Sequence, residues 1–177
     1  MTHALVVFES MFGNTKKIAE AIADGLRTGM TAELAEVGSA PVTLGPDVDL
    51  LVVGGPTHAF SMSRQSTRAD ASRQGADDRA ATGIGLREWL DRVAADSARP
   101  PVAAFDTKVS RPRLPGSAAR AARNRLRHAG FRPVAPAENF YVHGTPGPLV
   151  DGEPDRARAW GEQLVKAVHR TGAHRGK

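Results

Sequence analysis

The stretch of chain that decides the fold is ALVVFESMFGNT, residues 4–15. Its first five residues are apolar without interruption, which is typical of a strand buried on both faces of a sheet. From residue 14 the apolar positions take helical spacing, with Asn14 or Thr15 as the expected N-cap and with Gly25 and Gly29 near the exit. The stretch therefore predicts a buried strand that leads directly into a helix.

Strand and helix patterns alternate along the rest of the chain. Expected strands lie at 32–37 near an edge, at 49–53 closed by 54–56, at 101–105, and in short pieces at 131–134 and 138–142. Expected helices lie at 86–95, from the Gly116-Ser117 cap to about 129, and from Pro154 onward. This alternation predicts an α/β fold, a three-layer doubly wound five-stranded parallel sheet. Residues 61–83 are polar and rich in arginine, which predicts a mobile connecting segment with a helical turn or two.

Length and composition restrict the class of protein. The 177 residues predict one domain over residues 1–170, followed by a basic flexible tail at 171–177. The absence of cysteine excludes disulfides, thiolate zinc sites and cysteine-bound iron–sulfur clusters, so redox chemistry would need an organic cofactor. No histidine–carboxylate spacing indicates a metal site. Without a long apolar run or a signal-peptide pattern, we expect a cytoplasmic protein that does not insert into membranes.

The net charge of +5 is concentrated between Lys108 and Arg132, a segment that contains no acidic residue. Aromatic side chains are not interleaved with these arginines, so a solvated helix face is favoured over nucleic-acid binding. A basic adaptor that uses the arginine-rich helix after Gly116 is a minor alternative.

Three loops that follow the central strands, residues 9–15, 56–63 and 106–115, carry unusual chemistry. Open α/β sheets bind ligands beyond the carboxyl ends of their strands. In the first loop, a phosphate would meet unpaired N–H groups between Met11 and Thr15 and the positive end of the helix dipole. The loop has neither a P-loop lysine nor a G-x-G-x-x-G pattern, which argues against nucleoside triphosphates and Rossmann-type dinucleotides.

The pattern SMFGNT at residues 10–15 resembles the FMN phosphate loop of flavodoxins, and its Ser-Met-aromatic-Gly form is similar to flavodiiron proteins and flavodoxin-like NAD(P)H:quinone reductases. The resemblance implies a flavodoxin-like fold, a non-covalent FMN and transfer of electrons or hydride. The first-loop residues that it assigns to FMN are Ser10, Met11, Phe12, Gly13, Asn14 and Thr15. Phe12 stands where ordinary flavodoxins carry threonine, so one hydroxyl contact is absent.

In the second loop, the resemblance assigns residues to the isoalloxazine ring. These residues are Pro56, Thr57, His58, Ala59 and Phe60. Thr57 would hydrogen-bond the ring and Phe60 would shield its face. His58 is a possible proton donor, although a loop histidine is more often structural or solvated.

In the third loop, the resemblance assigns Asp106, Thr107 and Lys108 to the pyrimidine end of the ring. Asp106 could instead cap its own turn. Lys108 would stabilise the anionic reduced flavin by Coulomb attraction. From the last strand, Tyr141 or His143 could also approach the ring.

The predicted mouth of the pocket is basic, with residues Arg64, Arg68, Lys108, Arg111 and Arg113. This charge predicts a less negative potential for full reduction of the flavin than in an acidic, low-potential flavodoxin. It also predicts an acidic redox partner protein or a small anionic or quinone substrate. The sequence does not separate an electron carrier from an NAD(P)H:quinone reductase-type enzyme, and a flavodoxin-fold binding module without cofactor is the further alternative.

Overall fold

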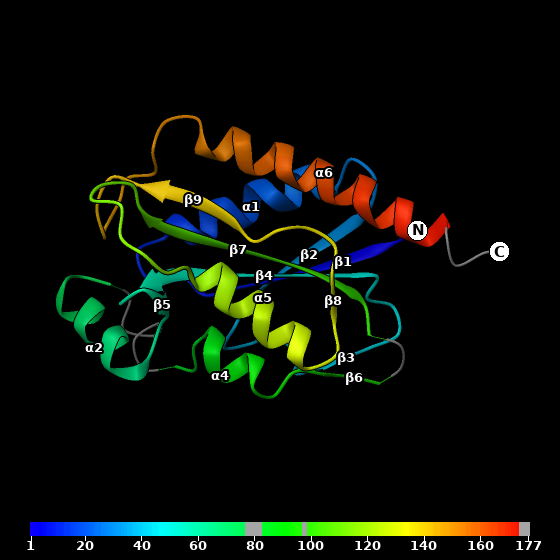
Figure 1. Ribbon diagram of the computed structural model, residues 1–177, viewed down its shortest axis with the longest axis horizontal. Coiled ribbons are helices and arrows are strands. Elements are labelled where there is room, and N and C mark those ends of the chain that lie inside the picture. The colour runs from blue at the N-terminus through cyan, green and yellow to red at the C-terminus, as the bar shows by residue number, and fades with distance from the viewer. Residues whose placement is uncertain (77–82, 97–98, 174–177) are drawn as a thin grey trace.

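The structure is a computed structural model that describes residues 1–76, 83–96 and 99–173. The elements, in order, are β1 His3–Phe8, α1 Asn14–Leu26, β2 Thr31–Glu36, β3 Thr43–Leu44, β4 Leu50–His58, β5 Ser61–Met62, α2 Gln65–Arg73, α4 Leu86–Leu90, β6 Ala94–Ala95, β7 Pro101–Val109, α5 Ala118–His128, β8 Arg132–Pro133, β9 Glu138–Val142 and α6 Glu153–Ala173 (Figure 1). No helix in these ranges is long and apolar enough to cross a membrane.

The main sheet has the order β2-β1-β4-β7, and β7 pairs on its other side with both β8 and β9. All of these pairings are parallel, and β2 lies at the edge, as its alternating sequence predicts. The predicted five-stranded, doubly wound α/β fold is confirmed, with β8 and β9 together in the fifth position. The short β5 is antiparallel to the end of β4, and β3 pairs with β6 in a separate small sheet.

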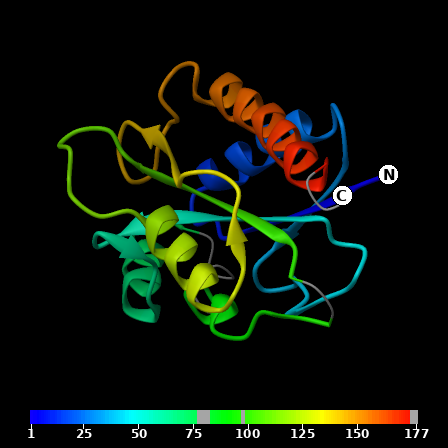
Figure 2. The same cartoon turned by 45° about the vertical axis from the view of Figure 1, so that its right-hand side comes forward.

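Helices cover both faces of the sheet. Figures 1 and 2 both show α1 and α6 on one side and α4 and α5 on the other. Side chains of β1 alternate between the two cores, so that Val6 packs with α1 and α6 while Val7 packs with α4 and α5. This double coverage is the physical reason for the uninterrupted apolar run at residues 4–8.

The contact between α1 and α6 depends on two glycines. A Cβ on Gly25 would lie 2.1 Å from the carbonyl oxygen of Arg158, and one on Gly161 would lie 2.4 Å from that of Ile22. Gly25 is the penultimate residue of α1, near the exit as predicted, and it allows the backbones of the two helices to approach.

Several predicted boundaries are wrong by a few residues. The β4 strand does not close at 54–56 but continues to His58, because 54–56 pair with 105–107 of the extended β7. The helix expected at 86–95 ends at Leu90 and is followed by β6. The N-cap of α1 is Gly13, whereas the sequence predicts Asn14 or Thr15.

The helix caps at other positions agree with the sequence. Ser117 caps α5 by accepting a hydrogen bond from the Arg120 N–H, and Gly130 follows that helix with φ +90°. Within 61–83, the expected helical turns are α2, which the short strand β5 precedes, while 77–82 lie outside the described residues. At the predicted tail, α6 continues to Ala173, and 174–177 lie outside the described residues.

Candidate functional site

The loop between β1 and α1 presents backbone donors at the start of a helix. Gly13 adopts the left-handed region with φ +88°, and a Cβ there would meet nothing within 4 Å. The Ser10 hydroxyl accepts hydrogen bonds from the N–H groups of Gly13 and Lys16, at 3.1 and 3.3 Å, and so orders the loop. Within the described residues, the N–H groups of Phe12, Asn14 and Thr15 have no acceptor. This arrangement suits an anion.

A narrow slot lies between this loop and the ends of β4, β7 and β9. Its lining residues are Met11, Phe12, Asn14, Thr15, Pro56, Thr57, His58, Thr107, Lys108, Val109, Val142 and Thr145. Its cavity volume is about 40 Å³, and the slot is partly open to solvent. A group the size of a phosphate fits this volume, and the rings of a larger ligand would extend beyond it.

The structure brings together most of the predicted site residues from all three loops. Sequence reasoning missed Val109, Val142 and Thr145. Val142 reaches the slot because β9 pairs with β7 over residues 105–109, a register that no local pattern reveals. The predicted residues outside the slot lining are Ser10, Gly13, Ala59, Phe60 and Asp106.

Asp106 supports the slot from behind. Its side chain is fully buried, and its Oδ2 accepts hydrogen bonds from the Thr57 hydroxyl at 2.9 Å, the Ser117 hydroxyl at 2.7 Å and the Ala119 N–H at 3.1 Å. Its Oδ1 accepts a fourth hydrogen bond, from the Asn139 amide at 2.8 Å. The carboxylate thus supports the start of α5 and connects β4, β7 and β9, and it does not cap its own turn, the alternative that the sequence left open.

A hydrogen bond between two threonines connects α1 with β7 at the floor of the slot. The hydroxyls of Thr15 and Thr107 lie 2.7 Å apart and are buried. The Thr57 hydroxyl, besides donating to Asp106, accepts from the Ala118 N–H at 3.0 Å. Thr57 uses its hydroxyl proton within the protein, and so does one of Thr15 and Thr107, which leaves one threonine hydroxyl and the backbone N–H groups as donors toward a ligand.

The β4–β5 hairpin positions the residues expected to shield a ring. His58 pairs with Ser61, so the turn has only Ala59 and Phe60, whose φ angles are 44° and 73°. Two-residue hairpin turns favour positive φ and usually carry Asn or Gly there. Phe60 is 55% exposed and its backbone packs against Gly116. Its shielding of a flavin stays a prediction.

The side chain of Lys108 lies along the slot, and its Nζ donates hydrogen bonds to the carbonyl oxygens of Leu114 at 3.3 Å and Gly116 at 2.7 Å. The ammonium therefore holds the 110–116 loop. Its effect on a reduced flavin stays a prediction.

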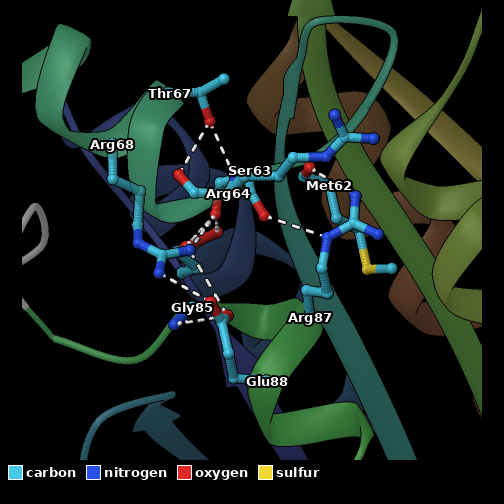
Figure 3. Close-up of polar contacts among 9 residues, drawn as sticks. Met62, Ser63, Arg64, Thr67, Arg68, Gly85, Arg87 and Glu88 are labelled. Atoms are coloured by element: carbon cyan, nitrogen blue, oxygen red, sulfur yellow. Dashed lines mark hydrogen bonds and ion pairs between the residues drawn. The ribbon is translucent and has the colours of Figure 1, made fainter.

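An ionic cluster behind the first loop was missed by sequence reasoning (Figure 3). Glu9, at the end of β1, is 3% exposed, and the Ser63 hydroxyl lies 2.5 and 2.8 Å from its two oxygens. Arg68 of α2 is 2% exposed; its Nη1 lies 3.9 Å from Glu9, and its Nη2 lies 2.7 Å from Glu88. A Cβ on Gly85 would lie 2.4 Å from Arg68 Nη1, so only glycine leaves room for this cluster.

Arg68 is thus not at the mouth of the pocket, where the sequence analysis placed it. The guanidinium is buried because it pairs with Glu88 and lies near Glu9, which satisfies the charge that burial would otherwise penalise. No spacing pattern links these three residues, since one follows β1 and the others lie in α2 and α4.

Burial shifts the pKa of two residues near the site. It raises the pKa of Glu9, while the Ser63 hydroxyl, Arg68 and the Leu86 N–H act in the opposite direction and Glu88 adds to the increase. Burial, together with the nearby Arg68 charge, lowers the pKa of His58. At neutral pH His58 is therefore mostly uncharged, which works against the hypothesis that it is a proton donor.

Comparison with known proteins finds a family match in the N-terminal part of the chain. Residues 6–85 match the family model described as Flavodoxin. No curated protein matches the sequence significantly. This part of the chain therefore resembles the flavodoxin family, as the SMFGNT pattern predicts.

Solved structures give the same fold over nearly the whole chain. A flavodoxin from the domain Archaea is 17% identical, with a TM-score of 0.65 and coverage of 95% of this chain and 99% of that chain. Flavodoxin 1 from Bacillus cereus is 18% identical, with a TM-score of 0.66 and coverage of 93% and 98%. The flavodiiron protein from Giardia intestinalis is 20% identical, with a TM-score of 0.60 and coverage of 96% and 37%.

Proposed function

We propose that this protein binds one FMN without a covalent bond and transfers electrons or hydride through it. The observation that carries the proposal is the group of unpaired N–H donors at Phe12, Asn14 and Thr15, placed at the start of α1 and at the end of the slot. A phosphate dianion would satisfy these donors and interact favourably with the helix dipole.

The residues of the slot fit such a cofactor at its phosphate end. The cavity volume of the slot is sufficient for a phosphate-sized group, and Gly13 has no Cβ to obstruct an approaching anion. The flavin, when bound, supplies the redox chemistry. The chain holds and orients it: Thr57 and Asp106 fix the end of β4 against α5, and Lys108 fixes the loop after β7.

Calorimetry with FMN and with riboflavin tests the proposal. Riboflavin lacks only the phosphate, so we expect apoprotein to bind FMN at least a hundredfold more tightly, which corresponds to about 2.8 kcal/mol. A silent titration with FMN overturns the proposal and leaves the cofactor-free binding module, which Phe12 and the small cavity volume favour. Equal affinity for the two compounds would show that the first loop does not bind the phosphate.

Two glycine variants localise the phosphate site. Gly13 and Gly152 both have positive φ, 88° and 84°, and a Cβ would meet nothing within 4 Å at either position. Gly13→Ala and Gly152→Ala should therefore each cost about 1 kcal/mol of stability from backbone strain. Only Gly13→Ala should weaken FMN binding, by tenfold or more. Equal affinities for FMN in the two variants contradict the site.

Anaerobic mixing of the FMN-loaded protein with NADH and with NADPH separates carrier from enzyme. Fast bleaching of the flavin absorbance by either would indicate a reductase. Inertness toward both would indicate a carrier that receives electrons from a separate reductase.

A further inference from the structure

A second cavity lies beside the slot, where β7 and β9 end. Its volume is about 590 Å³, and its lining residues are Ser110, Arg111, Arg113, Tyr141, His143 and Val150. Small-molecule sites in proteins typically have about 300–1,000 Å³. The cavity is therefore large enough for a small organic molecule, whereas the volume of the slot is not.

Side-chain alternation on β9 separates the cavity from the slot. Val142 lines the slot, whereas Tyr141 and His143, its neighbours in the chain, line the cavity. Successive side chains of a strand point to opposite faces. Asn139, on the same face as Tyr141, hydrogen-bonds Ser117 at the start of α5, so the cavity lies on the α5 side of the sheet.

The backbone around the cavity is held by hydrogen bonds. The Ser110 N–H donates to the carbonyl of Val142 at 2.9 Å, which extends the β7–β9 pairing beyond the strands. On the other side of β9, the His143 N–H donates to Pro148, and the Val150 N–H donates to Tyr141, both at 2.9 Å. The walls of the cavity are thus connected to the edge of the sheet, and the cavity is not formed by a free loop alone.

The charge of the cavity is positive and uncompensated. Arg111 and Arg113 are exposed, and neither has an ion-pair partner among the described residues, in contrast to Arg68, Arg125 and Arg156. No carboxylate lines the cavity. Glu153 at the start of α6 binds Arg156 and the Tyr141 N–H, and Asp151 is exposed one residue beyond Val150.

We propose that this cavity binds a small aromatic anion, with the guanidinium groups of Arg111 and Arg113 on its anionic group and the side chains of Tyr141 and Val150 against its ring. Guanidinium groups form charge-assisted hydrogen bonds with carboxylate, sulfonate and phosphate oxygens, while aromatic and aliphatic side chains supply apolar contact. Because Val109 and Ser110 are consecutive residues that line the slot and the cavity respectively, the anion lies next to the FMN site. The inference that this anion is the substrate of the flavin rests on the proposed function.

The test compares two probes that differ in one charged group, 1,4-naphthoquinone-2-sulfonate and 1,4-naphthoquinone. Calorimetry on the FMN-loaded protein should show at least tenfold tighter binding of the sulfonate. In the double variant Arg111→Ala/Arg113→Ala this preference should be lost. The matched control Arg120→Ala/Arg127→Ala, which removes the same charge from exposed positions on α5, should keep it.

Each outcome bears on the proposal. Equal binding of the two probes, no binding of either, or a preference that persists without Arg111 and Arg113 overturns it. An equal loss of preference in the α5 control would show a general effect of net charge and also overturns it. Failure of the proposed function is separate: the protein then does not bind FMN, and the same calorimetric comparison on the cofactor-free protein still shows the preference for the sulfonate.

Discussion

Asp106 of β7 and Glu9, which follows β1, are both buried carboxylates on strands that β4 separates, yet their surroundings differ. Asp106 accepts four hydrogen bonds from β4, α5 and β9. Glu9 has the Ser63 hydroxyl as its closest side-chain donor, and Arg68 lies 3.9 Å away and forms its shorter contact with Glu88. Burial raises the pKa of Glu9. Equal burial therefore does not imply equal stabilisation, because the number and distance of the donors decide how well the charge is held.

Removal of the better-satisfied carboxylate should have the largest effect. Asp106→Ala leaves donors on Thr57, Ser117 and Asn139 without their acceptor. We expect a loss of about 4 kcal/mol in the free energy of unfolding, measured by urea denaturation. Asp24→Ala, which breaks an exposed pair with Arg27, is the control and should cost less than about 1 kcal/mol. Similar losses in the two variants would contradict the role of Asp106.

Removal of the cation from the Glu9 cluster should be the next largest effect. Arg68→Met leaves two carboxylates, those of Glu9 and Glu88, without their shared cation, and we expect a loss of about 3 kcal/mol at pH 8. At pH 5 the loss should be smaller, because protonation of Glu9 removes part of the repulsion. A loss that is independent of pH would show that Glu9 does not interact with Arg68. Urea denaturation followed by circular dichroism at pH 5 and at pH 8 measures the two losses.

Loss of a single hydroxyl donor sharpens the comparison. Thr57→Val leaves Asp106 with three donors and the Ala118 N–H without its acceptor, so we expect a loss of about 1.5 kcal/mol. Ser63→Ala removes the closest side-chain donor of Glu9 and an acceptor for Arg68, so we expect about 2 kcal/mol. The order of the two losses is the result that matters, and the reverse order in urea denaturation would refute the proposed difference between the carboxylates.

Glu9→Gln should show the smallest change in the free energy of unfolding, a change that is near zero at pH 5 and depends on pH. The folded-state pKa of Glu9 is raised above its ordinary value of 4.5, so the folded protein binds the proton more tightly than the unfolded chain. Stability from this group is present at low pH and is lost as pH rises from about 4.5 through the folded pKa. Glutamine cannot ionise, so the variant should become more stable than the parent as the pH rises. A constant difference between pH 5 and pH 8 would contradict the shift.

The sequence determined the fold and the first loop. The run at residues 4–8 is apolar throughout because helices cover both faces of its strand, and that pattern is visible without coordinates. The turn at Gly13 follows from local backbone preference, and Ser117 and Gly130 mark the ends of α5 for the same reason. These features depend on residues within one turn of each other, where propensity and spacing decide the conformation.

Only the tertiary structure decided which distant residues share a partner. Arg68 is polar and lies in a segment without clear periodicity, so nothing local predicts that it is buried between Glu9 and Glu88. The same holds for the division of β9, whose Val142 lines the slot while Tyr141 and His143 line the cavity. Both results depend on strand register and on contacts between segments far apart in the chain, and the free energy of burying a charge is set by those contacts.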